Sequence, residues 1–346
     1  MIRVDDHGSL AAAIASLDPA RGGEVVLANR TYDVPGGTRF AHVHNLTVRG
    51  EGHATRVRLV GDGDIAFGNS KRGEMRNLRL RDLAIVTSAP RKGWALRLDQ
   101  CVRTTIDHVA VDPVDAGWRH EQGIWINQFD DVTLTNIEVN CRRTSLLVNG
   151  RHDQGYGGDL YLGGGSKITN FRTPAEWLPG SVGVHLAGAA GGVHLTEADI
   201  IYCGVGVLLD TAVAGVQNRE VFFDSGCYVD SCAEDCVRLG PKAAGKFQAD
   251  GAWIATAGLR SGGWPNGNGV NVHHDNGQCV GVIAGGTVFN CAGTGVAISG
   301  GRWGIGGMAA IHDNGGHGIH RASSKASVQL GDRLVYANRR GDLGGF

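Results

Sequence analysis

Aromatic, basic and acidic side chains gather in four long segments that interrupt a series of short apolar triplets. The segments are Pro113 to Gln122, Asn149 to Gly158, Phe171 to Val182 and Ala257 to Gly269. Aromatic rings stack on the apolar face of sugar rings, and Arg, His and carboxylate groups bond hydroxyl or acidic groups. The residues expected to bind a carbohydrate are Trp118, Arg119, His120, Arg151, His152, Tyr156, Trp177 and Trp264. The alternative is that each tryptophan only covers loop backbone.

Three carboxylates in the same segments, Glu121, Asp153 and Glu176, are candidate catalytic groups. Glycosidases use two carboxyl groups, about 5 Å apart for retention or roughly 6.5 to 9.5 Å apart for inversion. If Glu121 and Glu176 lie two parallel strands apart, their backbones are separated by about 9.6 Å. A lyase would instead need a base, for example His120, His152 or Tyr156, and a cationic group to neutralise a uronate. The residues leave the reaction open.

The elements that position these residues follow from an internal repeat. Segments such as Val132 to Cys141, Val193 to Cys203 and Val280 to Cys291 share two short apolar stretches that end in one small polar or thiol residue. These end positions are on average about 28 residues apart, within the 20 to 50 residues that are typical of solenoids. They are Thr87, Asp112, Cys141, Asn170, Cys203, Cys232, Thr256, Cys291, Asn314 and Asn338. A third apolar triplet follows most of them.

Three short strands per repeat, joined by tight turns, predict an all-β fold. Glycine, with 56 of 346 residues, suits such turns. We expect a single-stranded, right-handed parallel β-helix of about eleven coils over residues 36–346. Residues 1–35 are expected to form an N-terminal cap, with an amphipathic helix that begins after Ser9 and ends at Asp18-Pro19.

The opening of the chain resembles the pectate-lyase-like β-helix superfamily. A helix is followed by Gly22-Gly23-Glu24-Val25-Val26-Leu27 and then by Thr31-Tyr32-Asp33-Val34. With the repeats behind it, the resemblance covers nearly the whole chain. It implies a polysaccharide ligand more firmly than it implies a reaction, because the superfamily holds pectate lyases, polygalacturonases, alginate epimerases and many phage tailspikes. Fold alone does not specify function.

The cysteines and histidines do not predict a metal site. Cys141, Cys203, Cys232 and Cys291 end the same strand of their repeats, where the resembling family carries an internal asparagine ladder, so we expect them to stack in one column. The pair His42 and His44 has no third ligand in view. No cofactor is expected. A net charge of -1 disfavours nucleic acid, and no apolar run is long enough for membrane insertion.

These observations favour a phage-type tailspike or tail fibre subunit that recognises a bacterial surface polysaccharide, with depolymerase activity left open. Its location would be the virion, after assembly in the cytoplasm. We expect a homotrimer formed by lateral packing of rods, and contact with another virion protein through the N-terminal cap. One alternative is a free, extracellular bacterial polysaccharide lyase, glycoside hydrolase or epimerase. Another is a structural virion component without catalytic activity.

Overall fold

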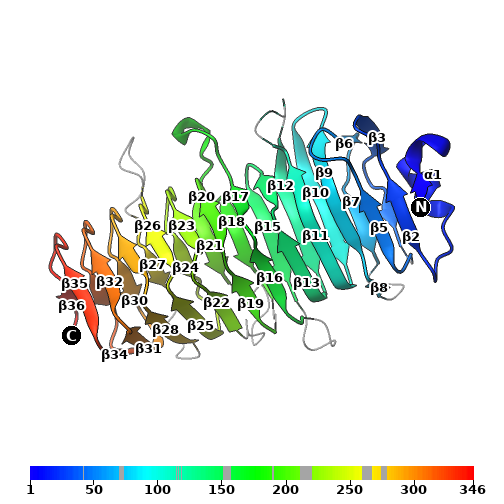
Figure 1. Ribbon diagram of the computed structural model, residues 1–346. Coiled ribbons are helices and arrows are strands. Elements are labelled where there is room, and N and C mark those ends of the chain that lie inside the picture. Colours follow the sequence, from blue (N-terminus) through cyan, green and yellow to red (C-terminus); the bar gives the residue numbers. More distant parts are fainter. Residues whose placement is uncertain are drawn as a thin grey trace.

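The computed structural model shows a rod of stacked coils, with the N-terminus at one end and the C-terminus at the other (Figure 1). It describes residues 1–41, 43–69, 74–113, 115, 117, 119–150, 157–188, 191–210, 220–258, 267–273 and 279–346. Most coils contribute three short strands, and the pairings between coils are parallel. The predicted fold class, an all-β right-handed parallel β-helix with a short N-terminal helix, is confirmed.

The N-terminal end is covered by a 3-10 turn, η1 (Val4–Asp6), and a six-residue helix, α1 (Leu10–Ala15). The Ser9 side chain accepts a hydrogen bond from the Ala12 N–H at 3.1 Å, as predicted for an N-cap. Leu10, Ala13 and Ile14 are buried. The helix therefore places its apolar face over the first coil, whose strand edges would otherwise be open to pairing.

The strands of each coil fall into three columns. The first column contains β1 (Ile2–Arg3), β2 (Gly23–Val26), β5 (Leu46–Arg49), β8 (Met75–Arg76), β13 (Asp130–Thr135), β16 (Leu160–Gly163), β19 (Val193–Leu195), β22 (Glu220–Phe223), β25 (Gly245–Asp250), β28 (Cys279–Ala284), β31 (Gly301–Gly306) and β34 (Ala326–Leu330). The second contains β3 (Thr31–Pro35), β6 (Arg56–Val60), β14 (Glu138–Asn140), β17 (Ser166–Thr169), β20 (Ala198–Ile201), β23 (Tyr228–Asp230), β26 (Trp253–Ala255), β29 (Thr287–Phe289), β32 (Ala309–His312) and β35 (Arg333–Tyr336). Two longer strands, β9 (Arg79–Thr87) and β11 (Cys101–Val111), run through both columns.

The third column is a separate twelve-stranded sheet, and we call it the third sheet. Its strands are β4 (Arg39–Phe40), β7 (Ile65–Gly68), β10 (Arg91–Asp99), β12 (His120–Asn127), β15 (Thr144–Asn149), β18 (Val182–Leu186), β21 (Val205–Leu209), β24 (Val237–Leu239), β27 (Val270–Val272), β30 (Val296–Ile298), β33 (Ile319–Arg321) and β36 (Leu343–Gly344). Side chains alternate inward and outward along each strand. The inward ones form one continuous apolar core.

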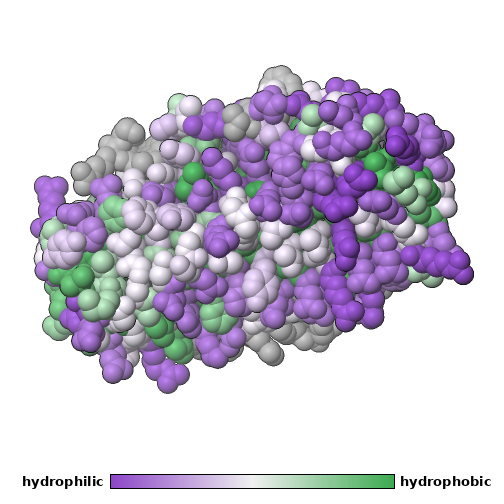
Figure 2. All heavy atoms as spheres, viewed as in Figure 1, coloured by the Kyte–Doolittle hydropathy of each residue, from purple (hydrophilic) through white to green (hydrophobic). Residues whose placement is uncertain are grey.

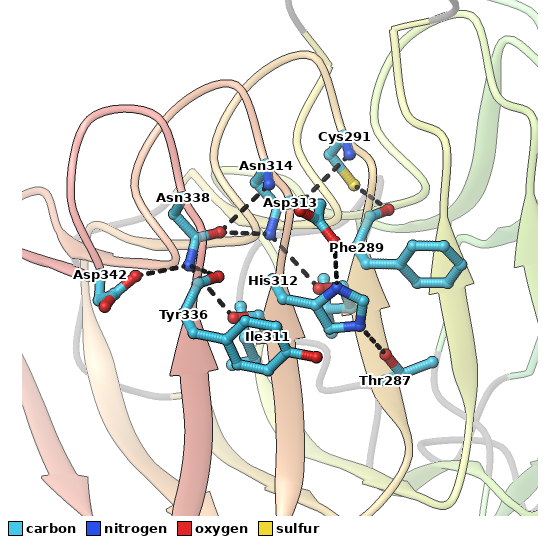
Figure 3. A network of polar contacts seen from close by, with 11 residues as sticks. Thr287, Phe289, Cys291, Ile311, His312, Asp313, Asn314, Tyr336, Asn338 and Asp342 are labelled. Atoms are coloured by element: carbon cyan, nitrogen blue, oxygen red, sulfur yellow. Dashed lines mark hydrogen bonds and ion pairs between the residues drawn. The ribbon is translucent and has the colours of Figure 1, made fainter.

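The predicted column of thiols lies inside the bend between the second column and the third sheet. Cys203, Cys232 and Cys291 share one register with Asn314 and Asn338, whose side chains are bonded at 2.9 Å (Figure 3). Each thiol packs over a glycine of the coil before it. A Cβ on that glycine would lie 2.6 to 3.3 Å from sulfur, in the pairs Gly123–Cys141, Gly183–Cys203, Gly206–Cys232 and Gly269–Cys291. Glycine is therefore required at these positions.

Two of the end positions predicted from the sequence, Thr256 and Asp112, precede the residue that actually lies in the inward column by one position. The register of β23, β26 and β29 puts Ala257, not Thr256, opposite Cys232 and Cys291. Thr256 has a φ of 55° and Asp112 a φ of 48°. Both therefore have the left-handed conformation that turns the chain just before the inward column. Cys236, on the coil before Ala257, stands where the other coils have a glycine. The larger side chain fits there because Ala257 is small.

All eight cysteines are free and buried, and burial raises the pKa of Cys101, Cys279 and Cys291 to about 12. Because the thiolate is the reactive species, we expect the native protein to react with Ellman's reagent at pH 8 at least about a hundredfold more slowly than free cysteine. In urea all eight thiols should react. Mass spectrometry after a short native pulse gives the count, and rapid labelling of the native chain would contradict the packing.

The visible surface in Figure 2 is largely hydrophilic, with hydrophobic groups at the C-terminal end of the rod. Leu334, Leu343 and Phe346, near that end, are 49%, 42% and 55% exposed. No helix in the described part of the chain is long and apolar enough to cross a membrane.

Candidate functional site

The loops predicted to bind sugar flank the third sheet. Segments 113–122 and 171–182 lead into the N-terminal ends of β12 and β18, whereas segment 149–158 follows the C-terminal end of β15. The described parts of the first two segments therefore adjoin the third sheet at the N-terminal ends of its strands. Six predicted site residues lie outside the described residues: Trp118, Arg151, His152, Asp153, Tyr156 and Trp264. The structure places the remaining five, which are Arg119, His120, Glu121, Glu176 and Trp177.

Arg119 and Glu176 join two of these loops. Arg119 Nη2 lies 2.5 Å from Glu176 Oε2, and its Nη1 donates to Asn140 Oδ1 at 2.9 Å. The Arg172 N–H also donates to Glu176 Oε2, at 3.2 Å. The Arg119 side chain is only 10% exposed, and this burial lowers its pKa from the ordinary arginine value. The arrangement holds Glu176 as a hydrogen-bond acceptor at the junction of coils that are two repeats apart.

The second predicted carboxylate, Glu121, also pairs with an arginine of another coil. Its Oε2 lies 3.2 Å from Arg143 Nε, and the Arg143 N–H donates to the Glu121 carbonyl at 2.7 Å. The Glu121 side chain is 23% exposed and that of Arg143 is 52% exposed. Both carboxylates therefore lie at the loop flank, each beside a guanidinium group that could also meet an anionic ligand.

His120 forms a buried pair with Asp112. His120 Nδ1 lies 2.7 Å from Asp112 Oδ2, the His120 N–H donates to the same oxygen, and neither side chain has exposed surface. His120 Nε2 and Asp112 Oδ1 have no partner among the described residues. The carboxylate orients the ring as in an acid–base pair. In this arrangement His120 contacts protein and not solvent, and its sugar contact stays a prediction.

Trp177 directly follows a 3-10 turn, η3 (Pro174–Glu176), in the loop that leads into β18. The backbone N–H of Trp177 donates a hydrogen bond to the Pro174 carbonyl at 3.3 Å, and its side chain is half-buried. The tryptophan thus lies on the same loop as Glu176, at the flank of the third sheet.

The structure adds an aromatic and cationic cluster on the third sheet itself. Trp125 points outward because its neighbours Ile124 and Ile126 point into the core. Its ring lies 5.7 Å from that of Trp94, and the Arg97 guanidinium lies over it at 4.1 Å. Both indoles remain partly exposed. Amphipathic rings beside a cation are a surface suited to sugars that carry acidic groups.

A polar row borders this cluster along the C-terminal ends of the strands. The buried Asp99 carboxylate accepts hydrogen bonds from Arg39 Nη1 and Asn127 Nδ2, each at 2.9 Å. Arg97 Nε lies 2.9 Å from Asp99 Oδ2 and forms an ion pair with it. The Asn149 amide continues the row by donating to Asn127 Oδ1 at 3.0 Å. One carboxylate thus fixes two guanidinium groups, which leaves the row with an excess of positive charge.

The surrounding elements are basic as well. The described residues of β4, β10, β12 and β15, and of segments 112–119, 141–143 and 171–177, contain eight Lys or Arg side chains and five carboxylates. This local excess contrasts with the net charge of -1 for the whole chain. It favours an anionic ligand at this face.

Sequence reasoning missed Trp94, Arg97, Asp99 and Trp125 because it searched the long loops. The sequence did contain a pattern that points to these residues. Arg97 and Trp125 lie opposite each other on adjacent coils, and each is flanked by two inward aliphatic residues. Outward residues one repeat apart must be neighbours in a parallel solenoid. Among the described residues, no group of three His, Cys, Asp or Glu side chains could hold a metal ion.

No protein family model and no curated protein matches the sequence. Solved structures do. The A-module of the Azotobacter vinelandii mannuronan C-5 epimerase AlgE4 aligns with a TM-score of 0.64 at 14% identity, over 100% of this chain and 98% of that one. The AlgE6 A-module from the same organism gives a TM-score of 0.55 at 13% identity, with the same coverage. The Dettilon tailspike protein gives a TM-score of 0.51 at 10% identity, and this chain spans 64% of its length. These likenesses confirm the fold: this chain is a parallel β-helix with the overall architecture of these three structures.

Proposed function

We propose that the protein binds an acidic polysaccharide across the outer face of the third sheet, between the loop flanks. The observation that carries this proposal is the cluster of Trp94, Trp125 and Arg97 beside the Asp99 row. The indoles offer apolar surface to sugar rings, and Arg97 and Arg39 offer charge to acidic groups. Because the strands of adjacent coils are about 4.8 Å apart, a chain that crosses several coils meets a new set of outward side chains at each one.

We further propose that the polysaccharide belongs to a bacterial surface, and that the protein acts as a phage-type tailspike or tail fibre subunit. The tailspike among its structural neighbours supports this assignment. The homotrimer, the virion location and the contact of the N-terminal cap with another virion protein stay parts of this proposal.

A second candidate function is an enzyme that acts on such a polysaccharide. One observation favours it: two carboxylates, Glu121 and Glu176, are each placed beside an arginine at the same flank. Two of the similar structures are A-modules of mannuronan C-5 epimerases. Lyase, hydrolase and epimerase chemistry all include proton transfer to or from the sugar, for which carboxylates are suitable groups.

The test incubates the purified chain with mannuronan, polygalacturonate and capsular polysaccharide, and follows binding, reducing ends, unsaturated products and anomeric proton signals. If the protein is an enzyme, Glu121→Gln and Glu176→Gln should each lower turnover at least about a hundredfold while binding persists, because a proton-transfer group is lost and its shape is kept. Glu220→Gln is the matched control, since Glu220 pairs with Lys246 on the first column, away from the third sheet.

The outcomes separate the functions. Binding without turnover identifies a receptor-binding rod, and purification together with phage particles then supports the tailspike assignment. Turnover that survives both glutamine substitutions contradicts the catalytic assignment of these carboxylates. If the chain binds none of the acidic probes, the proposed function is wrong.

A further inference from the structure

A second group of aromatic side chains lies on a different face, the outward side of the second column in the C-terminal half of the rod. It consists of Tyr228, Trp253, Phe289, His312 and Tyr336, one from each of five successive coils. Successive rings are 6.0, 4.7, 5.1 and 4.9 Å apart. Tyr228, Trp253 and Tyr336 are 43%, 38% and 49% exposed. We call this group the aromatic row.

The rings of the row have two orientations. Phe289, His312 and Tyr336 are nearly parallel, with interplanar angles of 16° and 4°, so they cover one another's faces (Figure 3). Trp253 stands at 89° to Phe289, and its Nε1 donates to Asp230 Oδ2 at 3.0 Å. Contacts with Asp230 on the preceding coil and Phe289 on the next place the indole beside Ala255, an outward residue with no exposed surface. Trp253 is thereby fixed and remains 38% exposed, which leaves ring surface available for stacking on a sugar.

An open polar pocket of about 680 Å³ adjoins the row. The chain turns there at Asn290, Asp313 and Ala337, which follow Phe289, His312 and Tyr336 and have φ values of 54°, 55° and 57°. Arg339 also lines the pocket. His312 Nδ1 lies 2.7 Å from Asp313 Oδ2, which ties the row to the pocket wall (Figure 3). Amide, carboxylate and guanidinium groups beside aromatic rings are the set that orients sugar hydroxyls.

The charge of this face differs from that of the third sheet. The outward positions of β20, β23, β26, β29, β32 and β35 carry two carboxylates, Asp199 and Asp230, and no Lys or Arg. Asp313 adds a third carboxylate at the pocket, where Arg339 is the one cation of the lining. Carboxylates repel uronates. An isologous contact with a second copy would also bring like charges together, so charge disfavours that occupant as well.

We propose that the aromatic row and its pocket form a second glycan-binding site, which takes uncharged sugar residues. A sugar ring stacks on Trp253, and Asn290, Asp313 and Arg339 bond hydroxyls of the same chain. This goes beyond the function proposed above, because it concerns another face and another class of sugar. The protein would thus contact a surface glycan at two places that differ in charge preference.

The experiment measures binding of the full chain to three neutral probes, dextran, laminarin and galactomannan, and to polygalacturonate as the acidic probe. We expect at least one neutral probe to bind, Trp253→Ala and Tyr336→Ala each to weaken it at least about tenfold, and Trp125→Ala to leave it unchanged. Tyr161→Ala is the matched control, because Tyr161 is an exposed aromatic residue on the first column. Unfolding midpoints show that each variant is folded, and Tyr336, in the last coil, is the variant less able to disturb the core.

Three outcomes would overturn this proposal without touching the first. They are failure of all neutral probes to bind, neutral binding that is unchanged in both Trp253→Ala and Tyr336→Ala, and a change of oligomeric state in these variants, which would identify a protein interface. Loss of polygalacturonate binding in Trp125→Ala alone bears on the third sheet only. The two sites are therefore tested independently.

Discussion

Replacement of Trp125 by alanine should weaken the binding of an acidic polysaccharide about 30- to 100-fold, or roughly 2 to 3 kcal/mol. The Trp125 ring contacts both the Trp94 ring, at 5.7 Å, and the Arg97 guanidinium, at 4.1 Å, and these three side chains carry the proposed site. Its loss removes apolar surface from the sugar and also frees Arg97 from the position in which the ring holds it. Large aromatic residues at the centre of an interface usually contribute the most binding energy.

Isothermal titration with polygalacturonate or mannuronan fragments measures the change. Tyr161→Ala, an exposed aromatic residue on another face, should alter the affinity less than twofold. Arg97→Gln should weaken binding and flatten its dependence on salt, because it removes one charge from the contact. An unchanged affinity in Trp125→Ala, with a normal circular dichroism spectrum, would remove the third sheet from the proposed function.

The loop residues beside the third sheet could be named from the sequence, whereas the aromatic and basic residues on the sheet itself could not. Arg119 pairs with Glu176, and Glu121 pairs with Arg143, because the repeat stacks loops at equivalent positions of neighbouring coils. That these residues bind or act on a sugar stays a prediction. Loop composition does not reveal burial, however. His120 belongs to the same polar segment, yet it lies under the loop against Asp112.

The coil architecture could be predicted because the core of each coil is built from the same few types of aliphatic and small residues. Alternating aliphatic residues in triplets specify short strands. The glycine on the coil before each of the column thiols is needed because the thiol packs directly against it. The one-residue error at Thr256 and Asp112 has a physical cause. A left-handed residue that precedes the inward column can be Thr, Asp, Tyr, Ser, Asn or Ala, so composition does not mark it, whereas the pairing register does.

The interior polar ladder leads to the second large effect. Asn170 is 1% exposed, and its Nδ2 lies 3.0 to 3.2 Å from four acceptors: the carbonyls of Cys141, Arg143 and Val182, and Ser145 Oγ. These acceptors come from the turn between β14 and β15, from β15 itself and from the first residue of β18. We expect Asn170→Ala to lower the free energy of unfolding by about 3 kcal/mol, because buried carbonyls lose their donor and a cavity replaces the amide.

Urea denaturation measures this loss, and Asn29→Ala, at an exposed position, should change the unfolding free energy by less than about 0.5 kcal/mol. Asn170→Asp should be worse than alanine at neutral pH, since it brings a carboxylate against carbonyl oxygens and raises the pKa of the new group in the folded state. The folded chain then binds a proton that the unfolded chain has released, so stability falls as pH rises above about 4. The two variants should therefore converge in acid and separate at neutral pH. Equal stability of the two across that range would show that Asn170 acts through its volume and not through its hydrogen bonds.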